Sequence, residues 1–486
     1  MKDILSSIER YKEWIANRGG MNEETAGQLA VRADEIDKDI HALIRIDADR
    51  IGLRGRVLAE LPDKPVLKGV PAAIKDNICI SGELTTCASK VLEGFRPPYN
   101  ATVIDKLEKA GALLFPSANM DEFAFGSSCE SSFYGPTRNP WDISRIPGGS
   151  SGGAAAAVAA GEVAFSLGSD TGGSIRQPAS LCGVVGLKPT YGRVSRYGLI
   201  AFASSLDQIG PVTRNVTDSA RVLETIAGYD HRDSTSVDME VPAYVEQLTG
   251  DISGTRIGIP REFFREGIDE QVLDRVMGAV SKLESLGAEV SEVSLPHTRY
   301  AVSCYYIIGP AEASSNLGRY DGAHYGHRSD KTGDMIDMYI DSRSEGFGEE
   351  AKRRVLLGTY SLSSGYYDAY YIKAQKVRTR IADDFKKIFS EYDCVVTPTS
   401  PTTAFRIGEK VDDPLKMYLS DVFTISANLA GIPAISVPCG FTDEGLPVGM
   451  QIMAEAFNES TMLNTAYAFE QATDHHLRVP AHLDAA

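Results

Sequence analysis

Short apolar segments that alternate with amphipathic helical segments constrain the fold of this chain most strongly. In "TVIDKLEKAGALLFPSANMDE", residues 102–122, a helix should stop at Gly111 and lead into a strand at residues 112–115. Residues 255–296 show a similar order: a strand comes first, then a helix that ends at Gly287, then a second strand. This alternation is typical of βαβ units, whose strands are parallel. The sequence therefore predicts an α/β fold with a mixed, largely parallel central sheet that helices cover on both faces.

The sequence divides into a short N-terminal part and one large domain. Residues 1–60 are expected to form a polar, helical N-terminal extension, and residues 61–486 a single large α/β domain. Within the extension, apolar residues recur at helical spacing on one face: Ala26, Leu29, Ala30, Ala33, Ile36, Ile40 and Leu43. A tyrosine-rich segment at about residues 300–389 should be mostly helical. Strand-like runs return at "DCVVTPT" and "PAISVPCG".

Charge and cysteine usage exclude several classes of protein. The chain has 49 lysines and arginines against 66 acidic residues, a net charge of -17, which disfavours direct binding to nucleic acid. Its seven cysteines are scattered singly without a CxxC pair, which predicts reduced thiols and neither a disulfide framework nor a metal site. The N-terminus lacks the apolar core of a signal peptide, and the apolar stretches are too short to span a bilayer. We therefore expect a cytoplasmic protein that does not contact membranes.

Two glycine-serine segments are the candidate reactive loops: "IPGGSSGGAAAAVAAG" at residues 146–161 and "GSDTGGSIRQPAS" at residues 168–180. A phosphate-binding loop needs a lysine after its last glycine, but Gly153 is followed by alanine. A flexible linker is disfavoured because the alanine run is a strong helix former. Gly-Gly-Ser at 172–174 could instead turn backbone N–H groups inward as an oxyanion hole, with the serine as nucleophile.

A serine nucleophile needs a base, and the sequence offers two kinds. The chain has eight histidines, of which only His41 precedes residue 231, and none lies in a motif that recommends it. A Ser-His-Asp triad with a distant histidine stays open. Lys75 follows the apolar run at residues 70–74, where burial would lower its pKa from the ordinary value and let it act as a neutral base.

Three segments together resemble the amidase signature family: "GVPAAIKDNI" around Lys75, "PGGSSGGAAAAVAAG" around Ser150 and "GSDTGGSIRQPAS" around Ser174. The steps of 75 and 24 residues between these positions fit the family, and the resemblance covers nearly the whole chain after residue 60. It implies a Ser-cisSer-Lys triad, in which Ser174 is the nucleophile and Lys75 the neutral base. Ser150, which follows a cis peptide bond in this family, would relay the proton.

The resemblance also implies the residues that surround the triad. Backbone N–H groups would form the oxyanion hole, at Thr171, Gly172, Gly173 and Ser174. Ser151 would support the relay by hydrogen bonding, although capping of the following helix is an equal alternative. The expected reaction is acyl transfer: the serine attacks an amide carbonyl, and water then hydrolyses the acyl-enzyme.

Further segments resemble one branch of that family, the glutaminase subunits of tRNA-dependent amidotransferases. They include "MDEFAFGSSCESSFYGPTRNPWD", "RRVLLGTYSLSSGYYDAYYIKAQKVR" and "YLSDVFTISANLAGIPA". The resemblance implies glutamine as substrate, with Arg354 binding its α-carboxylate, Asp421 its α-ammonium, and Tyr305 lining the pocket. Alternatives stay open, because Arg354 could be a solvated helix arginine and Asp421 a helix cap.

The same resemblance implies a heterotrimer. A B-type subunit would bind tRNA, ATP and Mg²⁺ and accept the ammonia, and a small C-type subunit would complete the complex, so that this chain needs no cofactor of its own. The ammonia would convert Glu-tRNA(Gln), Asp-tRNA(Asn) or both to the amidated forms. Two alternatives are a stand-alone amidase acting on small or aryl amides and a catalytically silent scaffold, although the intact Lys75, Ser150 and Ser174 argue against the scaffold.

Overall fold

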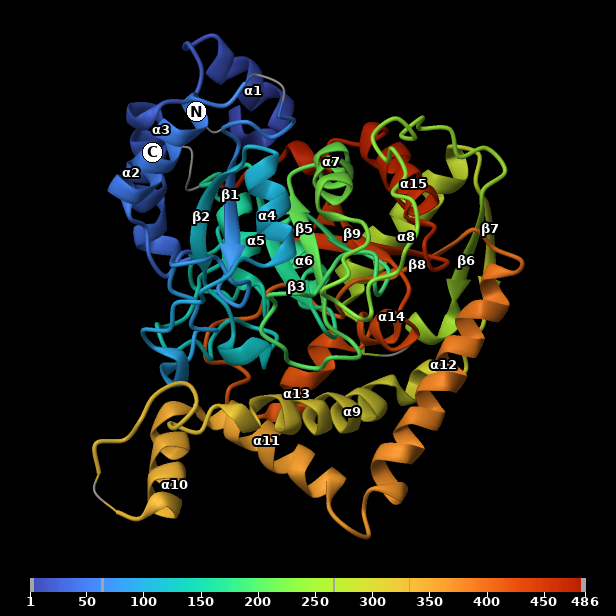
Figure 1. The fold of residues 1–486 in the computed structure, drawn as a ribbon. Helices are drawn as coiled ribbons and strands as arrows, with labels where there is room; N and C mark the ends of the chain where they lie inside the picture. Colours follow the sequence, from blue (N-terminus) through green and yellow to red (C-terminus); the bar gives the residue numbers. More distant parts are fainter. Residues whose placement is uncertain (1–3, 63–64, 265–266, 332, 482–486) are drawn as a thin grey trace.

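A ten-stranded sheet runs through the computed structural model, which describes residues 4–62, 65–264, 267–331 and 333–481. Its strand order is β2-β1-β3-β5-β4-β9-β10-β8-β6-β7 (Figure 1). The strands are β1 Pro71–Lys75, β2 Leu113–Ala118, β3 Phe165–Asp170, β4 Val185–Lys188, β5 Gln208–Thr213, β6 Arg256–Pro260, β7 Glu289–Val293, β8 Cys394–Pro398, β9 Ala434–Phe441 and β10 Pro447–Ala454. The predicted α/β class with a mixed sheet is confirmed.

Parallel and antiparallel pairings occupy different parts of the sheet. The groups β2-β1-β3 and β8-β6-β7 are parallel and form the two flanks. They contain the predicted βαβ units, in which α4 (Thr102–Lys109) joins β1 to β2 and α8 (Glu270–Ser285) joins β6 to β7. The pairings between the flanks are antiparallel. One of them is the β9–β10 hairpin, whose short connection permits only antiparallel pairing.

Helices lie on both faces of the sheet. In one layer, α7 (Val216–Ile226) contacts α4 and α15 (Glu459–Gln471), and α15 contacts α8. In the other layer, α5 (Gly152–Ala159) and α6 (Arg176–Cys182) contact each other and the strands. Every residue of α5 is buried, and its small alanine side chains let it pack closely against the sheet.

The N-terminal helices are α1 (Ile8–Ala16), α2 (Glu23–Ile40) and α3 (Ala48–Ala59). The predicted stripe of α2 is buried except for Ile36, which is half-buried, and Leu43 is buried just beyond the helix. These side chains belong to the same hydrophobic cluster as the residues of the sheet. The N-terminal segment therefore shares its core with the rest of the chain.

The segment at residues 300–389 is helical as expected. It consists mainly of α9 (Ala301–Asn316), α10 (Met335–Gly346), α11 (Glu349–Leu362) and α12 (Lys373–Phe389). In Figure 1, α9 and α11 lie below the strands, near the short helix α13 (Pro414–Tyr418). A second hydrophobic cluster joins this segment to α14 (Ile425–Ala430) and to residues around Phe123. The segment thus brings distant parts of the chain together below the strands (Figure 1).

All seven cysteines are buried and free in the structure. Across the described ranges, no helix is both long enough and apolar enough to cross a bilayer.

Candidate active site

Lys75 is the last residue of β1 and is completely buried. Its Nζ atom lies 2.8 Å from Ser150 Oγ, 2.8 Å from Ser151 Oγ and 2.9 Å from Ser169 Oγ. Burial lowers the pKa of Lys75 to about 8, although nearby acidic groups, Asp121 foremost, act in the opposite direction. The amine can therefore lose its proton near neutral pH, as a base must.

Ser150 and Ser151 precede α5 on the first glycine-serine loop. The Gly149–Ser150 peptide bond is cis. The backbone N–H of Ser151 donates to the carbonyl oxygen of Ser174 at 3.0 Å, which holds the two predicted serine segments side by side. The Ser151 hydroxyl does not cap α5, because it contacts Lys75 and donates to the Ser169 carbonyl at 3.1 Å. The capping alternative for Ser151 is therefore wrong, and the expected support of the relay stays a prediction, since the observed contact is with Lys75.

The loop after β3 carries the predicted oxyanion hole, and one of its four predicted donors is unavailable. The N–H of Gly173 donates to Asp170 Oδ1 at 2.9 Å, so the prediction for Gly173 requires correction. The N–H groups of Thr171, Gly172 and Ser174 have no hydrogen-bond partner within the described part of the chain. These three groups are left to meet a developing oxyanion.

The glycines of this loop are required by close neighbours. A Cβ atom on Gly172 would lie 2.7 Å from Cζ of Tyr305, which belongs to α9. Gly173 has a φ of +137°, and a Cβ there would overlap Thr424. Thr424 Oγ1 donates to the Gly172 carbonyl at 2.7 Å, and Thr171 Oγ1 donates to Asp207 at 2.7 Å. The loop is thus held from several sides in a conformation that larger residues would not fit.

Asp421 occupies a buried position behind the loop. It ends a short 3₁₀ turn, Leu419–Asp421, and is 6% exposed. One carboxylate oxygen accepts a hydrogen bond from the Ser127 hydroxyl, whereas Oδ1 is buried without a partner among the described residues. Burial raises the pKa of Asp421 to about 7, and the charge of Arg354 lowers it in part. The unpaired oxygen can receive a ligand, and the helix-cap alternative does not describe this side chain.

Arg354 is buried, with 3% of its side chain exposed, in contrast to the neighbouring Arg353. Its Nε donates to Glu350 Oε1 at 2.7 Å, and its guanidinium lies 4.6 Å from the ring centroids of Tyr306 and Tyr418. It lines a cavity of about 280 Å³, together with Tyr418 and residues around Ser128. The solvated-arginine alternative is therefore wrong for this position.

These features agree with the comparison to known proteins. The family described as Amidase matches residues 25–463. The chain belongs to the amidase family. The A subunit of glutamyl-tRNA(Gln) amidotransferase from Oceanobacillus iheyensis is 56% identical over 476 residues, which cover 98% of each chain. The corresponding protein from Gloeobacter violaceus, which carries the same name, is 55% identical over 481 residues, again 98% of each chain.

Solved structures of amidase-family proteins share the fold. The A subunit of glutamyl-tRNA(Gln) amidotransferase from Thermotoga maritima superposes with a TM-score of 0.77 at 47% identity, covering 92% of this chain and 91% of that chain. A bacterial aryl acylamidase superposes with a TM-score of 0.84 and 97% coverage of both chains, but at 23% identity. The second likeness concerns the fold alone, because enzymes of one fold can act on different substrates.

Sequence reasoning missed the ion pair that supports this amidase loop. Asp170 and Arg176 are both fully buried, with Nη2 and Nε of the arginine 2.9 and 3.0 Å from the carboxylate. Arg176 also donates to Asn428, Gln451 and the Thr424 carbonyl. Burial alone would raise the pKa of Asp170, but the Arg176 charge outweighs it and holds the pKa to about 2. The sequence did contain a signal for this ion pair, because Asp170 and Arg176 are two opposite charges within a motif of small and apolar residues.

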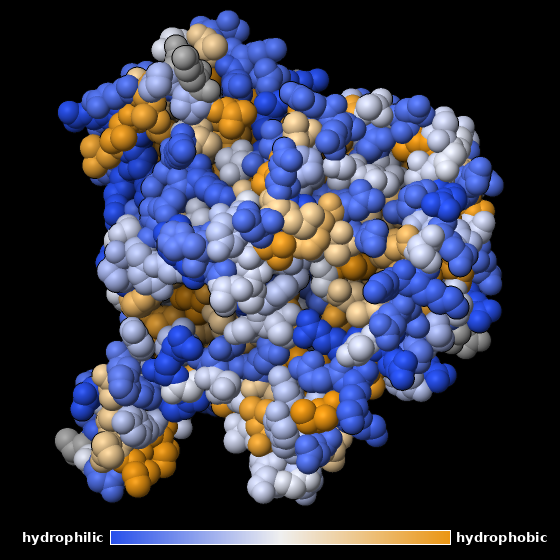
Figure 2. Space-filling view, turned by 45° about the vertical axis from the view of Figure 1, so that its right-hand side comes forward, coloured by the Kyte–Doolittle hydropathy of each residue, from blue (hydrophilic) through white to orange (hydrophobic). Residues whose placement is uncertain are grey.

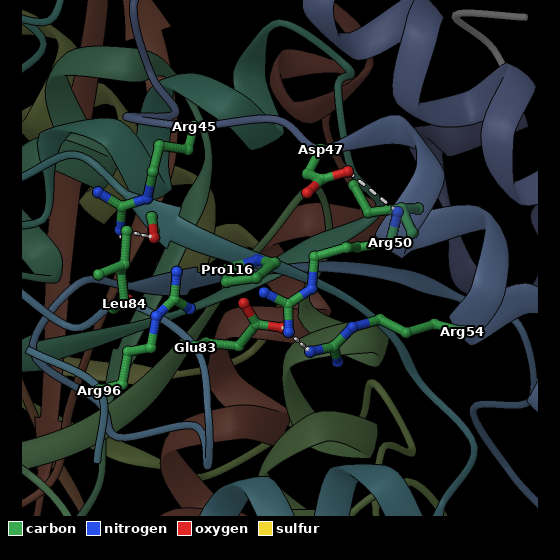
Figure 3. Close-up of a pocket in the computed structure, with 10 residues that line it drawn as sticks. Arg45, Asp47, Arg50, Arg54, Glu83, Leu84, Arg96 and Pro116 are labelled. Atoms are coloured by element: carbon green, nitrogen blue, oxygen red, sulfur yellow. Dashed lines mark hydrogen bonds and ion pairs between the residues drawn. The ribbon is translucent and has the colours of Figure 1, made fainter. Parts of the chain in front are cut away.

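A second, smaller cavity of about 100 Å³ contains none of the predicted site residues. Figure 3 shows Arg50 and Arg54 of α3 directed at Glu83, with Arg45 and Arg96 on the other side. Arg50 and Arg54 form ion pairs with Glu83 at 2.9 and 2.7 Å. These ion pairs connect the N-terminal helices to the loop that follows β1.

Proposed function

We propose that this chain is the glutaminase subunit of a tRNA-dependent amidotransferase and hydrolyses glutamine through Lys75, Ser150 and Ser174. The single observation that carries the catalytic part is the contact of buried Lys75 with Ser150, on the loop bonded to Ser174. The full-length relatives are named as A subunits of glutamyl-tRNA(Gln) amidotransferase, and these names support the biological part.

In the proposed acylation, Ser174 Oγ attacks the side-chain amide carbon of glutamine. The hydroxyl proton of Ser174 passes to Ser150 as the proton of Ser150 passes to neutral Lys75. The N–H groups of Thr171, Gly172 and Ser174 stabilise the oxyanion. The proton then returns through Ser150 to the departing nitrogen, which leaves as ammonia. Water hydrolyses the γ-glutamyl ester of Ser174 and releases glutamate.

Two buried charges would select the amino-acid end of glutamine. Arg354 offers a planar fork of donors that matches an α-carboxylate. Asp421 offers its unpaired Oδ1 to the α-ammonium, and such a partner would satisfy an oxygen that is otherwise buried alone. Tyr305, packed against Gly172, would line the same space. The clamp and the triad would together form a site for an amino-acid amide.

The chain would act within a heterotrimer. A B-type subunit would bind tRNA, ATP and Mg²⁺, and a small C-type subunit would bind beside it, which fits the net charge of -17 on this chain. Three apolar residues of α10 are largely exposed, and such a surface would suit contact with a partner subunit. Met335, Ile336 and Ile340 are 66%, 63% and 57% exposed. Figure 2 shows an orange patch on the lobe at the lower left, where α10 lies. Exposed apolar surface of this kind is typical of contacts between subunits.

Glutamine hydrolysis by the purified complex tests the proposal. The wild type should release glutamate and ammonia, and Ser174→Ala should abolish the release while the complex still assembles. Equal activity of the two proteins would refute the catalytic assignment. A wild type that hydrolyses small aryl amides as fast as glutamine would favour the stand-alone amidase instead.

A further inference from the structure

Arg354 forms a buried ion pair with one carboxylate of its own helix. Glu350 lies one helical turn earlier on α11, and its Oε1 accepts a hydrogen bond from Arg354 Nε at 2.7 Å. Residues four apart on a helix face each other, so this pair is set by the helix itself. Burial alone would lower the pKa of Arg354, but Tyr306 and Glu350 stabilise the cation and raise the pKa above the ordinary value.

Glu350 also connects Arg354 to its aromatic surroundings. The same Oε1 accepts a hydrogen bond from the Tyr418 hydroxyl at 2.9 Å, and the other oxygen pairs with Arg353. The Tyr418 ring stacks on Tyr306, with centroids 4.0 Å apart, and both rings contact the Arg354 guanidinium. The carboxylate therefore joins three elements, α9, α11 and α13, around one guanidinium.

The geometry decides which edge of Arg354 a ligand can use. A guanidinium carries five N–H donors in a rigid fork. Glu350 occupies the Nε edge, so a carboxylate entering the cavity would have to approach the terminal nitrogens, where the Tyr306 and Tyr418 side chains also lie. Without Glu350, the Nε–H of Arg354 would lose its acceptor, and the buried cation would lose its countercharge.

We propose that Glu350 is a positioning residue that aims the terminal nitrogens of Arg354 at the α-carboxylate of the substrate and so makes the site select amides of amino acids. This inference rests on the proposed glutaminase function. The orientation of Arg354 requires an acceptor at position 350, whereas the negative charge contributes separately, by stabilising the buried cation. Glu350→Gln keeps the acceptor for Arg354 and Tyr418, whereas Glu350→Ala removes it.

The test compares two substrates in the assembled complex: L-glutamine and 4-aminobutanamide, which is glutamine without its α-carboxylate. Glu350→Ala should raise KM for glutamine about tenfold, leave kcat within about twofold, and leave kcat/KM for 4-aminobutanamide unchanged. Glu350→Gln should keep the wild-type KM. The control Thr359→Ala should match the wild type, because Thr359 lies on the exposed face of α11 and its hydroxyl bonds to the Val355 carbonyl of the same helix.

Several outcomes would overturn the inference. Equal losses on both substrates would indicate a structural role, and an unchanged KM in Glu350→Ala would show that Arg354 needs no such support. If Glu350→Ala does not fold, Glu350→Asp moves the acceptor by one methylene and should raise KM for glutamine alone. A wild type that does not prefer glutamine over 4-aminobutanamide would instead contradict the proposed function, whatever the variants do.

Discussion

Lys75 should set the pH dependence of the chemical step. With a pKa of about 8, the amine is neutral in about one-tenth of the molecules at pH 7 and about nine-tenths at pH 9. If the neutral form is the base, kcat at saturating glutamine should rise about tenfold between pH 6 and 7. It should rise about tenfold again between pH 7 and 9, and then level off.

Two substitutions separate this explanation from others. Lys75→Arg keeps a cation that does not deprotonate in this range, and kcat should fall about a thousandfold. Asp121→Asn removes the neighbouring charge that most raises the pKa of Lys75, so the inflection should move below pH 8. The first substitution replaces the base and the second shifts its pKa, and both leave the Ser174 nucleophile in place.

The assay is ammonia release by the complex at saturating glutamine, measured from pH 5.5 to about 10. Saturation keeps the titration of the substrate site out of kcat. An inflection near pH 6.5 that survives Lys75→Met would indicate a histidine base. That result would refute the assignment of Lys75.

Three further predictions concern the surroundings of the triad. Because Asp421 must be ionised to bind an ammonium, KM for glutamine should fall about tenfold from pH 6 to 8, a dependence that Asp421→Asn should remove. Gly172→Ala should reduce kcat, since its new methyl would meet Tyr305, and unaltered kinetics would argue against this packing. Asp170→Asn should destabilise the fold by about 3–5 kcal/mol in thermal or denaturant unfolding, because it leaves Arg176 buried without a countercharge, and an unchanged melting temperature would contradict that role.

The sequence predicted the parts of the fold that depend on local pattern. The helices α4 and α8 end near Gly111 and Gly287, and both join parallel strands as the pattern indicates. The antiparallel centre was not predicted, because it follows from which distant strands pair. The strands β4 and β5 give too little local signal to reveal that pairing.

In the candidate site, too, some contacts were predicted from the sequence and others were not. The contact between Lys75 and Ser150 was expected from the resemblance to the amidase signature family. The Asp170 carboxylate that takes the N–H of Gly173 could not be predicted, because spacing does not reveal which donors a buried acid will bind. Glu350 was equally hidden, since its importance depends on Tyr418 from another element.

Trapping of the acyl-enzyme tests the central claim most directly. The complex is mixed with glutamine, quenched in acid within the first turnover, digested and mapped by mass spectrometry. A γ-glutamyl ester should be found on the peptide that contains Ser174, and Ser174→Ala should abolish it. An adduct on a different residue, or one that persists in Ser174→Ala, would contradict the account.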